Sequence, residues 1–121
     1  MSESGQVGSD EITVLLADYE QSAREWDHAA DDARTANSLF VRNHGVYKRL
    51  RGNSEGRHGI TALLADPIPG VRLMAATHSL EWQESEAVAV LEALAQTGGL
   101  HAVTAKYTLR GYHSGSLNLD W

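Results

Sequence analysis

Apolar residues along the chain recur at the three- and four-residue steps of an α-helix. The clearest run covers residues 12–30, where the apolar positions form one stripe of a helix that begins near Ser9 or Asp10. Five further stretches predict helices, and glycines or prolines separate most of them. Gly45 lies inside the first of these stretches and leaves a kink or an early helix end open. The five expected ranges are 33–51, 58–65, 69–80, 85–96 and 100–110.

The two ends of the chain predict less regular structure. Residues 1–9 are small and polar and predict a disordered N-terminal tail, which leaves 10–121 as one helical domain. Residues 111–121 alternate apolar and polar positions, and we expect this C-terminal tail to pack back across the last helices. A short strand is the less favoured alternative, because a single strand leaves its backbone groups without partners. In the last helix we expect burial of Leu100, Val103, Ala105, Tyr107 or Thr108, and Leu109.

A weak internal repeat connects the later helices. Ala76 and Ala105 are 29 residues apart, and so are Leu80 and Leu109. Repetition of a helix pair at such a spacing is typical of an α-solenoid, in which each pair buries one face on the next. The pattern therefore predicts an all-α fold, a short α-solenoid of about six helices in antiparallel pairs.

The motifs behind this repeat support a resemblance to known proteins. They include Leu63-Leu64-Ala65-Asp66-Pro67, Val71-Arg72-Leu73 with Ala75-Ala76, Ala36-Asn37 with Leu39-Phe40, and the run from Val90 to Ala95. The repeat resembles a HEAT-type repeat, and residues 12–117 are similar to a small bacterial family of unknown function with a HEAT-like helical fold. In that resemblance Asp66 and Arg72, on either side of a turn, tie neighbouring repeats together. The resemblance implies a fold and no established chemistry.

Residue types needed for catalysis or metal binding do not occur in the required patterns. The chain has no cysteine, and its six histidines include no HExxH motif. There is no GxSxG turn and no phosphate-binding loop. We therefore expect no enzyme activity, no metal and no cofactor. Asp66 and Arg72 are interpreted as a structural ion pair, and Asn37 as a residue that packs between helices or binds backbone.

Charge is distributed unevenly along the chain. The net charge is −6, yet residues 1–32 contain nine acids and one base. On the first predicted helix the acids border the apolar stripe, where like charges repel one another. A cationic partner would explain that arrangement, although an acidic helix that only favours solubility is an equal alternative. The candidate partner-binding residues are Glu11, Asp18, Glu25, Asp27, Asp31 and Asp32.

Size, charge and fold class together suggest a binding protein. The leading hypothesis is a non-catalytic module, similar to an immunity protein or antitoxin, that binds a basic, toxin-like protein as a monomer or weak homodimer. One alternative is a self-associating scaffold domain. Another is a nucleic-acid-binding regulator that uses the basic region 42–58, although the overall acidity opposes nucleic-acid binding. With no apolar run long enough for a membrane span and no signal peptide, we expect a cytoplasmic protein without a membrane partner.

Overall fold

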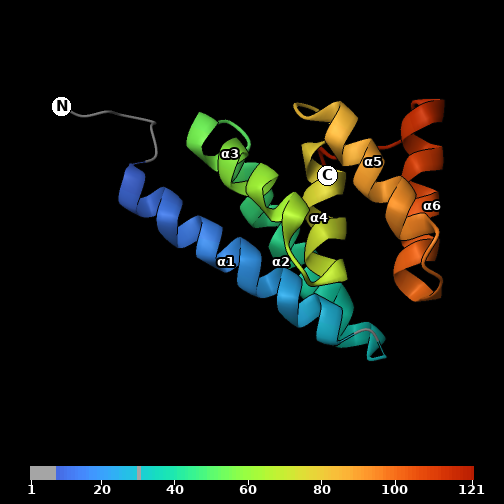
Figure 1. Ribbon diagram of the computed structural model, residues 1–121. Helices are drawn as coiled ribbons and strands as arrows, with labels where there is room; N and C mark the ends of the chain where they lie inside the picture. The colour runs from blue at the N-terminus through green and yellow to red at the C-terminus, as the bar shows by residue number, and fades with distance from the viewer. Residues whose placement is uncertain (1–7, 30) are drawn as a thin grey trace.

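The computed structural model describes residues 8–29 and 31–121 (Figure 1). This part of the chain contains six α-helices and one short 3-10 helix, and no strand, which confirms the all-α prediction. None of its helices is long and apolar enough to cross a lipid bilayer. The elements are α1 (Ser9–His28), α2 (Ala33–Leu50), α3 (Ser54–Ala62), η1 (Leu63–Ala65), α4 (Pro69–Ser79), α5 (Glu84–Ala95) and α6 (Gly99–Ser114).

Side-chain caps mark the starts of α2 and α3. Asp32 caps α2, where its side chain accepts a hydrogen bond from the Thr35 amide. Asn53 caps α3, so that this helix begins at Ser54 instead of near residue 58. Helix α2 continues through Gly45 without a break. Helix α6 runs on to Ser114 and ends at a glycine in the left-handed conformation.

The start of the chain also differs in detail from expectation. Helix α1 begins at Ser9, which the predicted tail had included, and Gly8 occupies the cap position. The remainder of the predicted N-terminal tail, residues 1–7, lies outside the described residues.

Helix α4 occupies the centre of the molecule. It contacts α1, α3, α5 and α6, while α1 pairs with α2 on one side and α5 pairs with α6 on the other (Figure 1). Val71, Ala75 and Ala76 on α4 are fully buried, and the two alanines let the flanking helices approach closely. Leu91 of α5 is fully buried as well. A side chain of this size contributes about 1.5–3 kcal/mol when it is removed from water.

A buried amide joins α1 to α2. The Asn43 Nδ2 atom donates to the backbone carbonyl of Tyr19 at 2.9 Å and to the Ser22 hydroxyl at 3.1 Å. All three residues are buried. Because most buried polar groups in proteins are hydrogen-bonded, these two bonds favour one register of the two helices.

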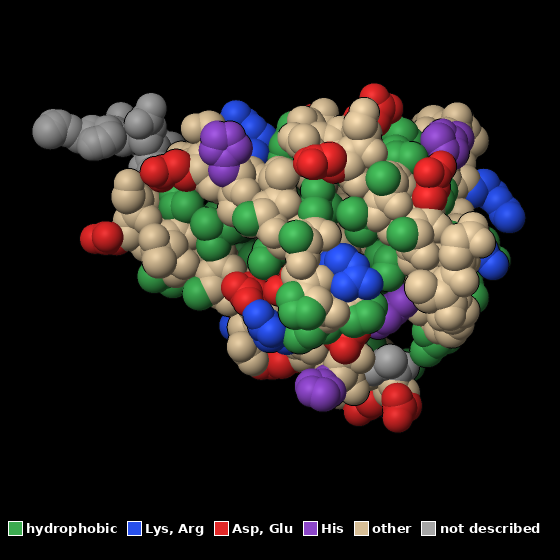
Figure 2. Space-filling model, in the orientation of Figure 1, with side chains coloured by type: hydrophobic (Ala, Val, Ile, Leu, Met, Phe, Trp, Pro, Cys, Tyr) green, Lys and Arg blue, Asp and Glu red, His purple; other side chains and the backbone are tan. Residues whose placement is uncertain are grey.

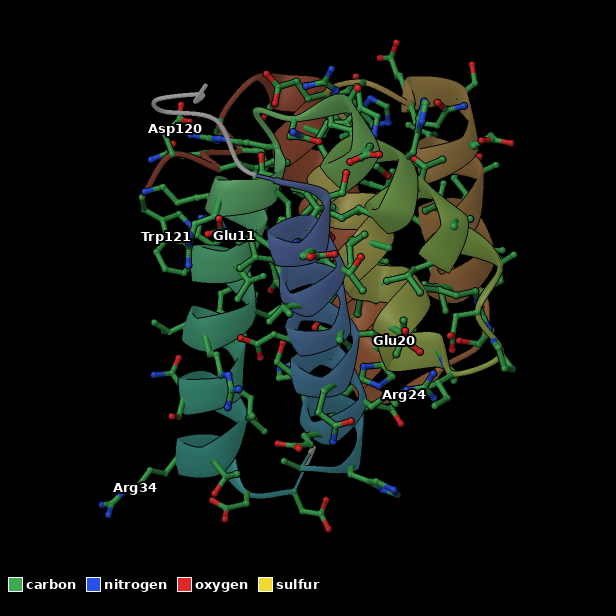
Figure 3. The ribbon with its side chains drawn as sticks, turned by 90° about the vertical axis from the view of Figure 1, so that its left-hand side faces the viewer. Glu11, Glu20, Arg24, Arg34, Asp120 and Trp121 are labelled. Atoms are coloured by element: carbon green, nitrogen blue, oxygen red, sulfur yellow. The ribbon has the colours of Figure 1, made fainter. Side chains whose placement is uncertain are left out.

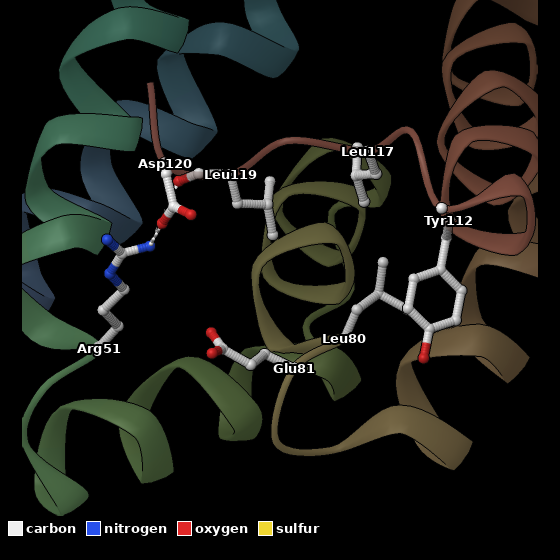
Figure 4. Close-up of a pocket in the computed structure, with 8 residues that line it drawn as sticks. Arg51, Leu80, Glu81, Tyr112, Leu117, Leu119 and Asp120 are labelled. Carbon is white, nitrogen blue, oxygen red and sulfur yellow. Dashed lines mark hydrogen bonds and ion pairs between the residues drawn. The ribbon is translucent and has the colours of Figure 1, made fainter.

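The C-terminal tail, residues 115–121, crosses from α6 over α4 to α2 (Figure 4). The Lys48 ammonium donates to the Trp121 carbonyl oxygen at 2.9 Å. The Arg51 guanidinium donates to the Leu119 carbonyl and pairs with the Asp120 carboxylate at 2.9 Å. Trp121 consequently lies beside α2 (Figure 3). The tail packs back on the helices and forms no strand, as expected. It extends beyond the last helices and reaches α2.

Candidate protein-binding surface

Two of the predicted partner-binding acids are paired with arginines of the same chain. The Arg49 guanidinium lies 2.7 Å from the Glu11 carboxylate, and the Arg42 guanidinium lies 2.7 Å from that of Asp18. The acids are seven residues apart on α1, and the arginines are seven apart on the antiparallel helix α2. Such exposed pairs contribute about 0–1 kcal/mol each, but they neutralise the charge that was expected to attract a partner.

Asp27 has a structural role. Its Oδ1 atom accepts a hydrogen bond from the Gly70 amide at 2.9 Å and lies 2.8 Å from His101 Nε2. Gly70 belongs to the first turn of α4, where an amide has no acceptor within its own helix. The His101 ring also stacks on Trp26, with centroids 5.1 Å apart. Asp27 thus links α1, α4 and α6, and a half-buried carboxylate used in this way is not free for a partner.

Little of the predicted acidic face remains available. Asp32 is the cap of α2, and its hydrogen bonds with Thr35 lower its carboxyl pKa. Glu25 and Asp31 are exposed, although Glu25 accepts a hydrogen bond from Gln21 of the same helix. On the face shown in Figure 2, acidic side chains are dispersed among basic and apolar ones. The charges that the sequence groups on one helix are therefore not grouped into one free surface.

The different roles of Asp27 and Glu25 can be tested by replacing each with alanine and comparing the effects on stability. We expect Asp27→Ala to lower the free energy of unfolding by about 1–3 kcal/mol, because it leaves the Gly70 amide and His101 without their acceptor. Glu25→Ala, on the exposed side of the same helix, should change it by less than about 0.5 kcal/mol. Urea denaturation of both variants gives the two values. Equal effects would show that Asp27 does not hold α4.

The predicted structural residues are placed differently from expectation. Asn37 is exposed and has no hydrogen-bond partner among the described residues, and it is Asn43, one and a half turns later, that binds backbone. The Arg72 guanidinium donates to the backbone carbonyls of Asp66 and Pro67 at 2.9 and 3.1 Å. The predicted side-chain ion pair does not form; the Asp66 carboxylate instead accepts a hydrogen bond from the Ile68 amide.

That carboxylate also faces α1. The Arg24 guanidinium lies 3.6 Å from it and pairs with Glu20 as well (Figure 3). Asp66 therefore connects the turn before α4 to α1. Its arginine partner is Arg24 of α1, and not the predicted Arg72.

The basic region 42–58 is engaged in contacts within the chain. Arg42 and Arg49 pair with α1, while Lys48 and Arg51 hold the C-terminal tail. Arg57 donates to the backbone carbonyl of Arg51 at 2.8 Å. A phosphate-binding surface needs cations that are free to replace counterions, so this arrangement does not favour nucleic-acid binding.

The largest unpartnered apolar stripe of a single helix lies on α6. Leu100, Val103 and Tyr107 are 63%, 48% and 66% exposed, and their spacing places them on one face. The expected burial of Leu100 and Val103 is wrong. Of the two alternatives Tyr107 and Thr108, it is Thr108 that is buried, together with Ala102 and Ala105. The sequence could have indicated this exposure, because α6 has apolar residues on two faces and packing against the rest of the domain buries only one of them.

Cationic residues flank this stripe. Lys106 and Arg110 lie next to it, and the Arg110 guanidinium sits over the Tyr107 ring, 5.5 Å from its centroid. A shallow depression of about 180 Å³ is lined by Val103, Lys106, Tyr107 and Arg110. Helix α6 contains no Asp or Glu. We call Leu100, Val103, Lys106, Tyr107 and Arg110 the α6 surface. It can bind apolar side chains and carboxylates together.

The fold and the sites define an all-α domain without a metal-binding cluster: no group of three His, Asp or Glu side chains in the described part of the chain could hold an ion. The family model described as a domain of unknown function (DUF2019) matches residues 10–112, and the chain belongs to this family. The resemblance to a family of unknown function is thereby confirmed. No curated protein and no solved structure matches the chain.

Proposed function

We propose that the domain is a non-catalytic protein-binding module whose partner docks on the α6 surface. The exposed stripe of Leu100, Val103 and Tyr107 carries this proposal, since monomeric proteins rarely leave such a stripe uncovered. Aromatic and arginine side chains, here Tyr107 and Arg110, are also the types that dominate the energetics of interfaces.

A HEAT-like solenoid is the architecture that we propose for the module. Helix contacts run largely in chain order, from α1 and α2 through α4 to α5 and α6. In a solenoid each helix pair covers the one before it, and α6 presents one apolar face that none of the described elements covers. The α6 surface would be that face.

The partner we infer is an acidic, amphipathic helical segment. Its apolar side chains would cover Val103 and Tyr107, and its carboxylates would meet Lys106 and Arg110 at the edge. Charge complementarity supports this choice over a second copy in an antiparallel α6–α6 contact, because such a contact would bring the two sets of cations together.

The analogy with immunity proteins has lost most of its support. It required a free acidic face for a basic, toxin-like partner, and of the six candidate acids only Glu25 and Asp31 stay clear of other structural elements. We therefore propose that the primary binding surface lies on α6 instead of α1.

Site-specific photocross-linking tests the proposal. A photoreactive amino acid at Val103 should give one main adduct in native host cells, whereas the same group at exposed His58 on α3 should not. The purified adduct partner should contain an acidic amphipathic helix. Lys106→Glu with Arg110→Glu should weaken its binding to the domain at least about tenfold, which corresponds to about 1.4 kcal/mol. An adduct with a second copy of the chain, or none, would overturn the proposal.

A further inference from the structure

A hollow of about 360 Å³ lies between the C-terminal tail, the end of α2 and the link from α4 to α5 (Figure 4). A second hollow, of about 540 Å³, adjoins it, because Arg51, Glu81 and Asp120 line both. Sites for small molecules usually have volumes between about 300 and about 1,000 Å³. We call the two hollows together the tail groove. Its size suits a small molecule.

One half of the tail groove is apolar. Leu80 follows α4, Leu117 and Leu119 belong to the tail, and the Tyr112 ring comes from α6. Leu80 is buried and the other three are half-buried. The Tyr112 hydroxyl donates to the Glu84 carboxylate, which does not line the groove, so the polar atom of this ring already has a partner. This half therefore offers a wall for an apolar group.

The other half carries two positive and two negative side chains, which are Arg51, Arg57, Glu81 and Asp120. The Arg51 guanidinium and the Asp120 carboxylate pair with each other at 2.9 Å. Glu81 is exposed and has no ion-pair partner among the described residues, and Figure 4 shows its carboxylate turned toward the Arg51–Asp120 pair from across the groove. Arg57 and Glu81 are thus the two charges that a ligand can use.

Arg57 is held in place without being neutralised. Its Nη1 atom donates to the backbone carbonyl of Arg51 at 2.8 Å, and this is the one hydrogen bond that its guanidinium makes in the described part of the chain. A backbone carbonyl carries no net charge, so the positive charge of Arg57 has no carboxylate to balance it there. A carboxylate is the group that a guanidinium binds most strongly, through charge-assisted hydrogen bonds.

The balance of charge determines which ligands fit. The four charged side chains of the groove cancel formally, so a simple anion meets two carboxylates beside the arginines, and a simple cation meets two arginines beside the carboxylates. A molecule that carries one charge of each sign can pair both of its charges. The apolar half requires, in addition, that this molecule have an apolar side.

We propose that the tail groove binds a free α-amino acid with an apolar side chain. Its carboxylate meets Arg57, and its ammonium meets Glu81. Its side chain lies against Leu80 and Leu117. An α-amino acid carries its two charges on one carbon, which suits two opposite charges that line one groove without pairing. This site is separate from the proposed protein-binding site, because the groove and the α6 surface share no residue.

L-Leucine is the probe, together with two analogues of similar shape that each lack one charge. Leucinamide has no carboxylate, and 4-methylpentanoate has no ammonium. Each is titrated near pH 7 into the full chain, and the methyl resonances of Leu80 and Leu117 are followed by NMR. We expect saturable binding of L-leucine. Both analogues should bind at least about fivefold more weakly, which corresponds to about 1 kcal/mol.

Two variants assign each charge to its partner. Glu81→Gln should remove the difference in affinity between L-leucine and 4-methylpentanoate, since the ammonium then has no carboxylate to meet. Arg57→Gln should remove the difference between L-leucine and leucinamide. Glu92→Gln, at an exposed acid of α5 outside the groove, is the control and should leave all three affinities unchanged.

Three results would overturn the proposal. The first is that L-leucine shows no saturation by about 10 mM, ten times a Kd of about 1 mM. The second is that either analogue binds as tightly as L-leucine. The third is that Glu81→Gln behaves like Glu92→Gln. The first two results are obtained on the unmodified chain, so they do not depend on how any variant folds.

Discussion

Replacement of Gly56 by alanine is expected to lower the free energy of unfolding by about 3 kcal/mol. Gly56 is buried in the first turn of α3, where this helix meets the end of α2. A Cβ atom there would overlap the backbone carbonyl of Leu50. Because backbone cannot rotate away as a side chain can, the helices must separate, and such overpacking costs about 1–3 kcal/mol or more. Urea denaturation measures the change.

The same substitution at Gly45 is the matched control. Gly45 lies within α2, is exposed, and has nothing within 4 Å of an added Cβ. Alanine favours the helix over glycine by about 1 kcal/mol, so Gly45→Ala should stabilise the domain. If both variants are stabilised, the α2–α3 junction is looser than the structure indicates.

Stability should also fall steeply as the pH drops below about 6.5. Burial lowers the pKa of His78 well below its usual value. The pKa of His44 is also lowered, by burial and by the positive charge of nearby Lys48. Between the folded and unfolded pKa values the unfolded chain binds more protons, so acid favours unfolding. Each histidine contributes a slope of up to about 1.4 kcal/mol per pH unit. Urea midpoints at pH 7.5, 6.5 and 5.5 measure this slope above the range in which most carboxylates titrate.

Two histidine variants separate this effect from general acid sensitivity. His78→Gln removes one buried titrating group and should make the slope clearly smaller. His113→Gln changes an exposed histidine at the end of α6 and should leave the slope as it is. An unchanged slope in His78→Gln would mean that the buried imidazoles do not control acid stability.

Periodicity and turn residues were sufficient to predict most of the fold. The stripe that begins at Ile12 predicted α1, and the two prolines after Asp66 predicted the break before α4. The start of α3 was missed because the expected range 58–65 followed the apolar positions alone, whereas Asn53 caps a helix that begins four residues earlier, at Ser54.

The candidate site was harder to predict, since it depends on which helices face each other. Acids on α1 suggested a free surface only while α1 was considered alone. Arg42 and Arg49 repeat at the same seven-residue spacing as Asp18 and Glu11, and this match could have indicated the pairing. Nothing in the sequence brings His44 and His78 together, because they lie 34 residues apart on helices that are not consecutive.

The path of the C-terminal tail has a further consequence. Helical domains in which segments touch only their neighbours can fray from either end, because losing a terminal helix costs only one interface. Here the last residues are bonded to Lys48 and Arg51 of α2, so the latest part of the chain is fastened to one of the earliest. Fraying from the C-terminal side must therefore release these bonds to α2, which makes α6 and the tail more cooperative with the rest of the domain than a simple end segment would be.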